Sequence, residues 1–420
     1  MAVDDSKGES LPGEIWMINH YAITPDLPGG TRHYDFGCEL KKAGFTVRIF
    51  ASDVNHALRR HVKLKDGRLW TAESVNGVDF IWVRTADYQR NDWRRAWNML
   101  SFAFNVLRVG FRVKGFPHAI VGSSPHLFAA LSAWWLAKRK GASFILELRD
   151  LWPQALVDMG LPESSIMVRL LRIIEKFLYT VADKIIILAH GSYSYLVNRG
   201  VTPGKIVYIP NGVHLGNFRL DNHQKTRLQA RARFGFTRFT VVYTGAHGPA
   251  NALETILGAA DLLRGRNDVE FVLVGDGQVK DDLLRKAAGL KLENVRFLPP
   301  VPKNEVPELL AAADAAVITL RAVDAFSYGV SPNKLFDYMA ACKPVICAVP
   351  GEMARLVEQN KAGVAVEAEN PRALAAAVEH ILAMNEGERG AMGRRGRELI
   401  EREFSREILA KRLLESLGCL

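Results

Sequence analysis

Short β-branched runs alternate with longer helical patterns along the whole 420-residue chain, and this alternation constrains the fold more than any other feature. The runs are nearly continuous in apolar residues, as in parallel strands covered by helices on both faces. Two successive sets predict an α/β chain with two doubly wound, Rossmann-like domains facing across a cleft. The first set is Ile15–Asn19, Thr46–Ala51, Phe80–Arg84, Ala119–Gly122, Phe144–Leu148, Lys184–Ala189 and Ile206–Ile209. The second set is Thr240–Thr244, Glu270–Val274, Val295–Leu298, Ala316–Thr319, Val345–Ala348 and Val364–Val366.

The strand pattern pauses over Gly212–Gly235, where polar and basic residues accumulate. We therefore expect an N-terminal domain over 1–215 and a C-terminal domain over 216–395. The stretch Glu398–Leu417 is charged and amphipathic and has no strand after it. We expect it to form one helix, in a segment 396–420 that crosses back to the first domain. Because ligands of doubly wound sheets bind at the carboxyl ends of the strands, a ligand cleft is expected between the domains.

Composition narrows the class of protein. Hydrophobic residues make up 48% and charged residues 24%, both ordinary for a globular enzyme. The N-terminus is polar and acidic rather than a signal peptide, and the longest apolar run is far below the roughly 20 residues of a membrane-spanning helix. A cytoplasmic protein is therefore expected. Its cysteines are scattered without metal-ligand spacing, at positions 38, 342, 347 and 419.

The formal net charge of +10 calls for an acidic partner, such as a phosphorylated small molecule or an anionic lipid. Nucleic acid is the weaker explanation, because the chain has no zinc-finger spacing, RNA-binding aromatic motif or basic tail.

The segment Ser331–Ile346 predicts a short helix that feeds a buried strand. Pro332 suits the first helical turn, whose free amides and dipole attract an anion. Lys334 adds a positive charge in the same turn, and Asp337 follows as a hydroxyl acceptor. This combination favours a nucleoside diphosphate, although an ordinary capped helix–strand junction has the same local features.

Three further segments of the second domain are candidates for nucleotide contact. Gly245 and Gly248 lie in a loop after the first strand, and His247 between them is available to a phosphate or sugar hydroxyl, or is simply structural. Gly275 ends a strand in a sharp turn of a common kind. Val301 lies in a proline-held loop whose backbone groups suit a base edge.

Two segments of the first domain follow strands and point at the expected cleft. The loop Pro28–Arg32 precedes a helix near His33, and Gly29 and Gly30 permit close approach of a ligand or simply form a tight turn. The pair Arg149 and Asp150 ends another strand, where a ligand contact and a buried structural ion pair are equally compatible with the pattern.

Several catalytic classes are disfavoured. The loop Pro28–Arg32 does not have the sequence Gly-x-Gly-x-x-Gly, so a nicotinamide enzyme is not indicated. The sequence has no nucleophile elbow, His-Glu-x-x-His or Asp-x-Asp motif, and the last absence argues against metal-dependent sugar-nucleotide transferases. No metal and no cofactor are therefore expected.

Taken together, the motifs resemble the retaining, two-Rossmann-domain (GT-B) glycosyltransferases of family 4, over almost the whole chain. The group with Ser-Pro-Asn-Lys-Leu-Phe-Asp-Tyr-Met-Ala is similar to bacterial enzymes that build lipid-linked envelope or capsule polysaccharides, often N-acetylhexosamine or fucosamine transferases. The segments that carry the resemblance are the Gly29-Gly30 loop, Pro210–Val213, Val274–Gly277, Val301–Lys303 with Glu305–Pro307, Ala311–Asp314 and Ser331–Ile346.

The resemblance implies metal-independent transfer from a sugar nucleotide, usually UDP, with retention at the anomeric carbon. By position, Asp337 matches the second acid of the family's Glu-x7-Glu motif and would hold the ribose hydroxyls, whereas the first acid falls at Gly329. The family's phosphate-clamping Arg and Lys fall near Ala246 and Asn251.

These departures leave Lys334 as the cation for the leaving diphosphate, helped by amides of Ser331, Asn333 and Gly245. The family's histidine beside the donor sugar falls at Arg149.

The stretch Asp92–Val113 predicts a helix with two apolar stripes separated by a narrow polar strip. One stripe can be buried in the domain while the other meets lipid headgroups, although burial of both is the alternative. The predicted membrane contacts are Trp93, Arg94, Trp97, Phe104, Arg108 and Phe111.

The resulting expectation is a transferase on the inner face of the cytoplasmic membrane, with a lipid-linked or glycan acceptor on the first domain and UDP-sugar on the second. Two rivals stay open. A UDP-sugar 2-epimerase of the same architecture would convert the sugar nucleotide without an acceptor. A non-catalytic scaffold subunit is suggested by Gly329, Ala246 and Asn251, and it would bind nucleotide weakly or not at all.

Overall fold

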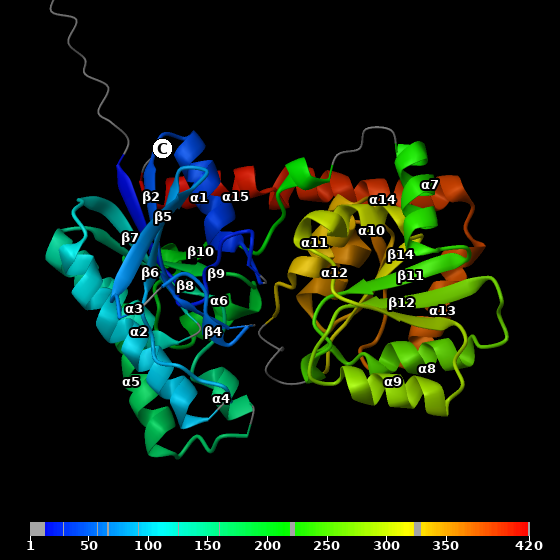
Figure 1. The fold of residues 1–420 in the computed structure, drawn as a ribbon, viewed down its shortest axis with the longest axis horizontal. Coiled ribbons are helices and arrows are strands. Elements are labelled where there is room, and N and C mark those ends of the chain that lie inside the picture. Colours follow the sequence, from blue (N-terminus) through cyan, green and yellow to red (C-terminus); the bar gives the residue numbers. More distant parts are fainter. Residues whose placement is uncertain are drawn as a thin grey trace, which may run out of the picture. The chain divides into compact units, whose positions relative to one another are not determined.

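The structure, a computed structural model, describes residues 13–418 except 28, 57, 65–66, 91, 125, 159, 219–222 and 323–328, and the side chains of 223–226 are also outside the description. Pro28 of the predicted glycine loop and Cys419 therefore lie outside the described residues. The chain divides into two compact units (Figure 1). The first comprises Met1–Ile187, Leu196–Ile209 and Ala410–Leu420, and the second Leu188–Tyr195 and Pro210–Leu409.

The first unit is built on an eight-stranded sheet in the order β10-β9-β8-β7-β1-β2-β6-β5. All neighbours pair in parallel except β5, which is antiparallel to β6. The strands are β1 (Glu14–Ile18), β2 (Thr46–Ser52), β5 (Trp70–Val75), β6 (Val78–Val83), β7 (Pro117–Ser123), β8 (Ser143–Leu148), β9 (Lys184–Ile187) and β10 (Ile206–Tyr208), with a separate two-residue pair β3 (Val54–Asn55) and β4 (Arg60–His61). The helices are α1 (Arg32–Lys42), α2 (Trp93–Arg112), α3 (Leu127–Lys140), α4 (Gln154–Asp158) and α5 (Ile166–Val181), and α6 (Gly191–Val197) lies across the boundary between the two units.

The strand order reverses between β1 and β7, and this reversal sorts the helices onto the two faces. Right-handed crossovers put α1 on one face and α2, α3 and α5 on the other. The helix α3 packs on β7 and β8 and lies between α2 and α5, so these three helices form one layer (Figure 1).

The second unit has a six-stranded parallel sheet in the order β13-β12-β11-β14-β15-β16, the strand order of a Rossmann fold. Its strands are β11 (Phe239–Thr244), β12 (Val269–Val274), β13 (Val295–Leu298), β14 (Ala315–Thr319), β15 (Val345–Ala348) and β16 (Gly363–Ala365). Its helices are α7 (His223–Phe234), α8 (Glu254–Leu262), α9 (Lys280–Gly289), α10 (Val306–Ala312), α11 (Asn333–Ala340), α12 (Glu352–Gln359), α13 (Pro371–Ala383) and α14 (Glu386–Leu399), and α15 (Arg406–Ser416) lies across the boundary between the second unit and the last segment of the first.

Each face of this sheet has its own hydrophobic core. One core joins the sheet to α10, α11 and α12, and the other joins it to α8, α9 and α13 (Figure 1). Strands buried on both sides explain why the sequence shows continuous apolar runs instead of alternation.

The predicted α/β class with two doubly wound, Rossmann-like parts is confirmed, and every predicted strand is present within two residues at its ends. Three strands were not predicted. The pair β3 and β4 is too short to give a pattern, and β5 is an edge strand with half-buried and exposed residues.

The prediction of one helix over Glu398–Leu417 is wrong. The helix α14 ends in a π-turn over Ile400–Phe404, and α15 begins only after Ser405. The break arises because Val213 pairs with this segment: its N–H donates to Phe404 O at 3.1 Å, and its C=O accepts from Arg406 N at 3.0 Å.

Candidate functional site

In the second unit, the carboxyl ends of β11 and β14 mark the point where the strand order reverses, which is where doubly wound sheets bind ligands. The loop after β11 packs on the loop after β12: Gly245 N–H donates to Val274 O at 3.0 Å and His247 N–H to Asp276 O at 2.8 Å. Gly275 has φ +149°, and a Cβ there would lie 1.9 Å from Gly245 O. The packing of the two loops is therefore enough to explain why residue 275 is a glycine, and no ligand contact is needed to explain it.

Lys334, in the first turn of α11, reaches back to the β11 loop. Its Nζ donates to Tyr243 Oη and to Asn251 Oδ1, both at 2.8 Å, and it lies 4.4 Å from the centre of the Tyr243 ring. Desolvation lowers the pKa of this ammonium to about 7. In the described part of the chain, no carboxylate is among the hydrogen-bond partners of this partly buried cation, which is therefore suited to receive an anionic ligand.

His247 is fully buried, and among the described residues neither of its ring nitrogens has a hydrogen-bond partner. Burial lowers its pKa to about 4, so the ring is neutral. A buried imidazole at the reversal point with both nitrogens unused is unusual, because buried polar groups are nearly always hydrogen-bonded.

The other predicted donor-side residues lie around α11 and the β11 loop. Ser331 is tied to Asn211, whose backbone N–H donates to Ser331 Oγ at 2.9 Å and whose Nδ2 donates to Ser331 O at 2.6 Å. Asn333 begins α11 and is exposed, whereas Asp337 is half-buried one turn after Lys334. Gly248 is the residue before a 3₁₀ turn at Pro249–Asn251. Val301 is half-buried and packs against the hydrophobic core of the second unit.

Gly329 has φ +88°, a backbone conformation that disfavours a glutamate. A Cβ at this position would lie 3.3 Å from Glu352 Oε2, and this oxygen accepts from His190 N–H at 2.9 Å. The carboxylate of Glu352, at the start of α12, thus lies beside Gly329, where the Glu-x7-Glu motif has an acid and this sequence does not.

In the first unit, a cavity of about 150 Å³ opens at the carboxyl ends of the strands. It brings together the predicted residues Gly29, Gly30 and Arg149 with His20 and Tyr21. Asp150 does not line it: this side chain is exposed, and within the described residues it has no ion pair with Arg149. The buried ion pair considered from the sequence is therefore not formed.

His20 lies at this cavity in a hydrogen-bonded chain that determines its tautomer. Ala129 N–H donates to His126 Nδ1 at 3.3 Å, so His126 Nε2 carries the proton and donates to His20 Nδ1 at 2.8 Å. Burial lowers the pKa of both histidines, that of His126 to about 3. His20 therefore offers a neutral, weakly basic ring whose Nδ1 is already hydrogen-bonded.

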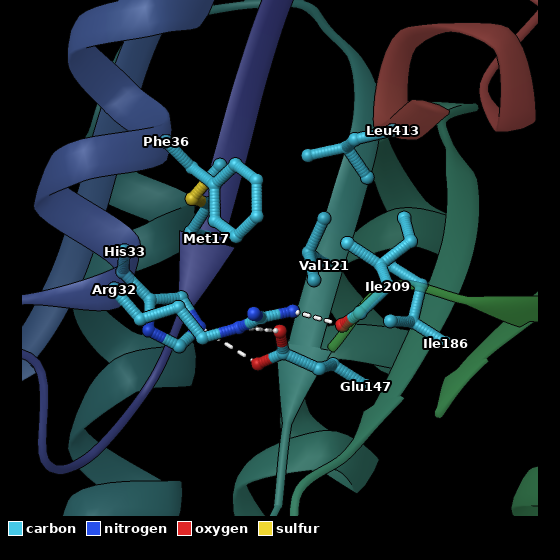
Figure 2. Close-up of a pocket in the computed structure, with 9 residues that line it drawn as sticks. All are labelled: Met17, Arg32, His33, Phe36, Val121, Glu147, Ile186, Ile209 and Leu413. Atoms are coloured by element: carbon cyan, nitrogen blue, oxygen red, sulfur yellow. Dashed lines mark hydrogen bonds and ion pairs between the residues drawn. The ribbon is translucent and has the colours of Figure 1, made fainter. Parts of the chain in front are cut away.

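His33 belongs to a buried cluster and does not line this cavity. Figure 2 shows Glu147 accepting from Arg32 Nε at 2.9 Å and from His33 Nε2 at 2.8 Å, around a cavity of only about 10 Å³. Ser123 Oγ adds a third bond to Glu147 at 2.6 Å, and Asn19 Nδ2 occupies His33 Nδ1 at 2.9 Å. Both ring nitrogens of His33 are thus engaged within the unit.

The predicted two-faced helix is α2. Met99, Phe102, Val106 and Val109 are buried, whereas the other stripe is exposed, with Trp93 72% and Phe104 63% accessible. Arg94 and Arg108 lie over the rings of Trp93 and Phe104, at 5.7 Å from each centre. The remaining predicted contacts, Trp97 and Phe111, are also exposed. Among the described helices, none has the length and apolar content to cross a membrane.

Sequence reasoning missed Tyr243, Glu147 and Glu352. Tyr243 and Glu147 lie at or next to the last residue of a strand, a position that could have singled them out. Glu352 reaches Gly329 only through the fold, and no local pattern connects the two.

Two family models match the chain. The model described as "Glycosyl transferase 4-like domain" matches residues 29–212, and "Glycosyl transferases group 1" matches residues 238–384.

Curated relatives are similar over much of the chain. The probable glycosyltransferase WbjE of Pseudomonas aeruginosa is 26% identical, over 60% of this chain and 63% of that protein, so just under two thirds of its length is aligned. The putative colanic acid biosynthesis glycosyl transferase WcaI of Escherichia coli K12 is 25% identical, over 83% of this chain and 86% of that one. A D-inositol 3-phosphate glycosyltransferase of Geodermatophilus obscurus is 30% identical, over 92% of this chain and 86% of that one.

Solved structures share the fold. Sucrose-phosphate synthase from Thermosynechococcus elongatus has a TM-score of 0.74 at 19% identity, covering 96% of this chain and 98% of that one. Anabaena HepE in complex with UDP-glucose has a TM-score of 0.70 at 15% identity, covering 97% of this chain and 100% of that one.

Proposed function

The chain belongs to the family 4 glycosyltransferases and has their GT-B fold, and we propose that it transfers a sugar from a UDP-sugar to a lipid-linked or glycan acceptor during cell-envelope polysaccharide biosynthesis. The proposed sugar is an N-acetylated hexosamine or deoxyhexosamine, transferred with retention and without a metal ion. The name of WcaI supports an envelope polysaccharide, and the HepE complex with UDP-glucose supports the nucleotide.

The observation that carries this proposal is the position of Lys334 at the reversal point of the second sheet, bonded to Tyr243 and Asn251. The leaving UDP gains negative charge as the glycosidic bond breaks, so a fixed cation there stabilises the transition state. Backbone amides of Ser331, Asn333 and Gly245 are proposed to assist, and Asp337 to hold the ribose hydroxyls.

We assign the acceptor to the first unit, where Arg149 and the rings of Tyr21 and Trp82 line the cavity of about 150 Å³. Arg149 is proposed to contact a polar group of the acceptor or donor sugar. Because a lipid-linked acceptor is reached at a membrane, the exposed stripe of α2 is proposed to contact the inner face of the cytoplasmic membrane.

The test is a transfer assay with a panel of UDP-sugars and a lipid-extract acceptor, with and without a chelator. The assay measures the release of UDP and the anomeric configuration of the product. Chelator-insensitive UDP release with a retained linkage is expected, and Lys334→Ala should lower the rate roughly 10²–10³-fold. The matched control Lys286→Ala, an exposed lysine of α9, should leave it unchanged. Conversion of the sugar nucleotide without acceptor would instead identify an epimerase.

A further inference from the structure

A second exposed apolar stripe lies on α5. Its residues follow helical spacing on one face and are Ile166, Met167, Leu170, Ile173 and Phe177, with Ile166 84% and Ile173 67% accessible. The opposite face of α5, with Val168, Leu171 and Leu178, is buried. The pattern repeats that of α2, where Trp93, Trp97, Leu100, Phe104 and Phe111 are exposed.

The helix α3 joins the two stripes into one surface. Ser132 Oγ donates to Ala103 O of α2 at 2.9 Å, and the Trp134 ring meets Phe177 of α5 edge-on at 4.7 Å. Trp134 and Trp135 are half-buried on the outside of α3. Because α3 packs between α2 and α5, the two exposed stripes belong to the helices on either side of these tryptophans, and we call the outer surface of the three helices the three-helix face.

The charge of this face has one sign. The exposed charged residues of the three helices are all basic: Arg94, Arg108 and Arg112 on α2, Lys138 and Arg139 on α3, and Arg169 and Lys176 on α5. The single acidic residue of these helices, Glu175, is buried and accepts from Tyr179 and Arg172. Cations lie over rings of the face: Lys138 is 5.5 Å from Trp134 and Arg139 is 4.6 Å from Trp135. Apolar rings with cations beside them match the headgroup region of a bilayer, where aromatic bodies enter and charges meet phosphates.

We propose that the three-helix face docks the first unit on an anionic lipid bilayer, with α3 and α5 contributing alongside α2. A second copy of the chain fits less well, because a symmetric contact would place two uniformly basic faces against each other. This inference deepens the proposed function and rests on it for the need to reach a membrane acceptor, but its residues are separate from the nucleotide site.

The test uses the full chain and co-sedimentation with phosphatidylcholine vesicles, with and without phosphatidylglycerol, at low and high salt. The double variant Ile166→Ser with Ile173→Ser removes apolar area from α5 alone. Its control is Leu228→Ser with Leu262→Ser, two exposed leucines of the second unit at 67% and 53% accessibility. Because all four side chains are on the surface, unchanged melting temperatures are expected. UDP titration of each variant reports the nucleotide site separately.

The wild type and the control should bind anionic vesicles at low salt and release them at high salt, and the α5 double variant should bind about tenfold more weakly or worse. Vesicle binding by the double variant equal to that of the control would overturn the proposal, as would no binding by the wild type. A wild-type dimer in sedimentation velocity that the double variant abolishes would assign the face to a second copy. If the wild type binds anionic vesicles but does not bind UDP, the result would count against the proposed function and not against the membrane-docking proposal.

Discussion

At the scale of single residues, Lys334 is the side chain on which the proposed nucleotide site depends. Its local sequence predicted a cation in the first turn of a helix, and the structure adds what sequence could not provide, namely bonds to Tyr243 and Asn251. Asn251 falls where the family pattern has a lysine, and here it orients a lysine from another element. The identity of the cation was predictable, whereas its environment depends on residues 83 and 91 positions away.

Binding of UDP should therefore take up a proton near pH 7.5. The free ammonium has a pKa lowered to about 7, and an anionic diphosphate beside it favours the charged form and raises that pKa. Affinity for UDP should fall as pH rises from 7 toward 9. Calorimetry in buffers of different ionisation enthalpy measures the uptake, and Lys334→Ala should abolish it. Equal heats in all buffers for the wild type would contradict the assignment.

Glu352 is the clearest case of a residue that sequence spacing hides. We predict that its carboxylate, 3.3 Å from where a side chain on residue 329 would begin, acts beside the donor sugar in place of the acid missing from Gly329. Glu352→Gln should lower the transfer rate roughly 10²–10³-fold, while UDP affinity changes little. Glu358→Gln, an exposed residue of the same helix, is the control. A Glu352→Gln enzyme with wild-type turnover would refute this role.

At the scale of elements, the cluster around Glu147 connects the start of α1 to the ends of β7 and β8, and Figure 2 shows its bonds from Glu147 to Arg32 and His33. Arg32 and Glu147 are each two positions from a residue that lines the cavity proposed for the acceptor, Gly30 and Arg149. Sequence patterns found these elements because each has a strong local signal. The cluster itself joins residues more than a hundred positions apart, such as Arg32 and Glu147, which no local pattern can predict.

Glu147→Ala should destabilise the first unit by about 3–5 kcal/mol, because it removes the carboxylate that compensates the buried charge of the Arg32 guanidinium. Glu401→Ala, which removes an exposed partner of Arg397, should cost less than about 1 kcal/mol. Urea denaturation of both variants measures the difference. Similar unfolding curves for the two would show that the buried pair contributes little.

Stability should also depend on acid through this cluster. Ionic partners hold the pKa of Glu147 well below 4.5 against the opposing effect of burial. A lowered carboxyl pKa means that the stabilisation is present above pH 4.5 and is lost as pH falls below it.

At the scale of the whole molecule, the net charge of +10 has a partial explanation in the three-helix face, where basic residues greatly outnumber acidic ones. Sequence periodicity identified the α2 stripe because helical spacing is local. It did not identify the partnership with α5, because adjacency through α3 is a property of the fold. The two sheets, in contrast, were predictable nearly in full, since buried parallel strands leave a continuous apolar signal.

The central claim, that this chain uses a UDP-sugar through the Lys334 site, is tested most directly by calorimetric titration of the purified protein with UDP, GDP and ADP. The account predicts that UDP binds most tightly, that Lys334→Ala weakens this binding at least tenfold, and that Lys286→Ala does not change it. Absence of UDP binding, or equal UDP affinity in the Lys334→Ala variant, would contradict the account.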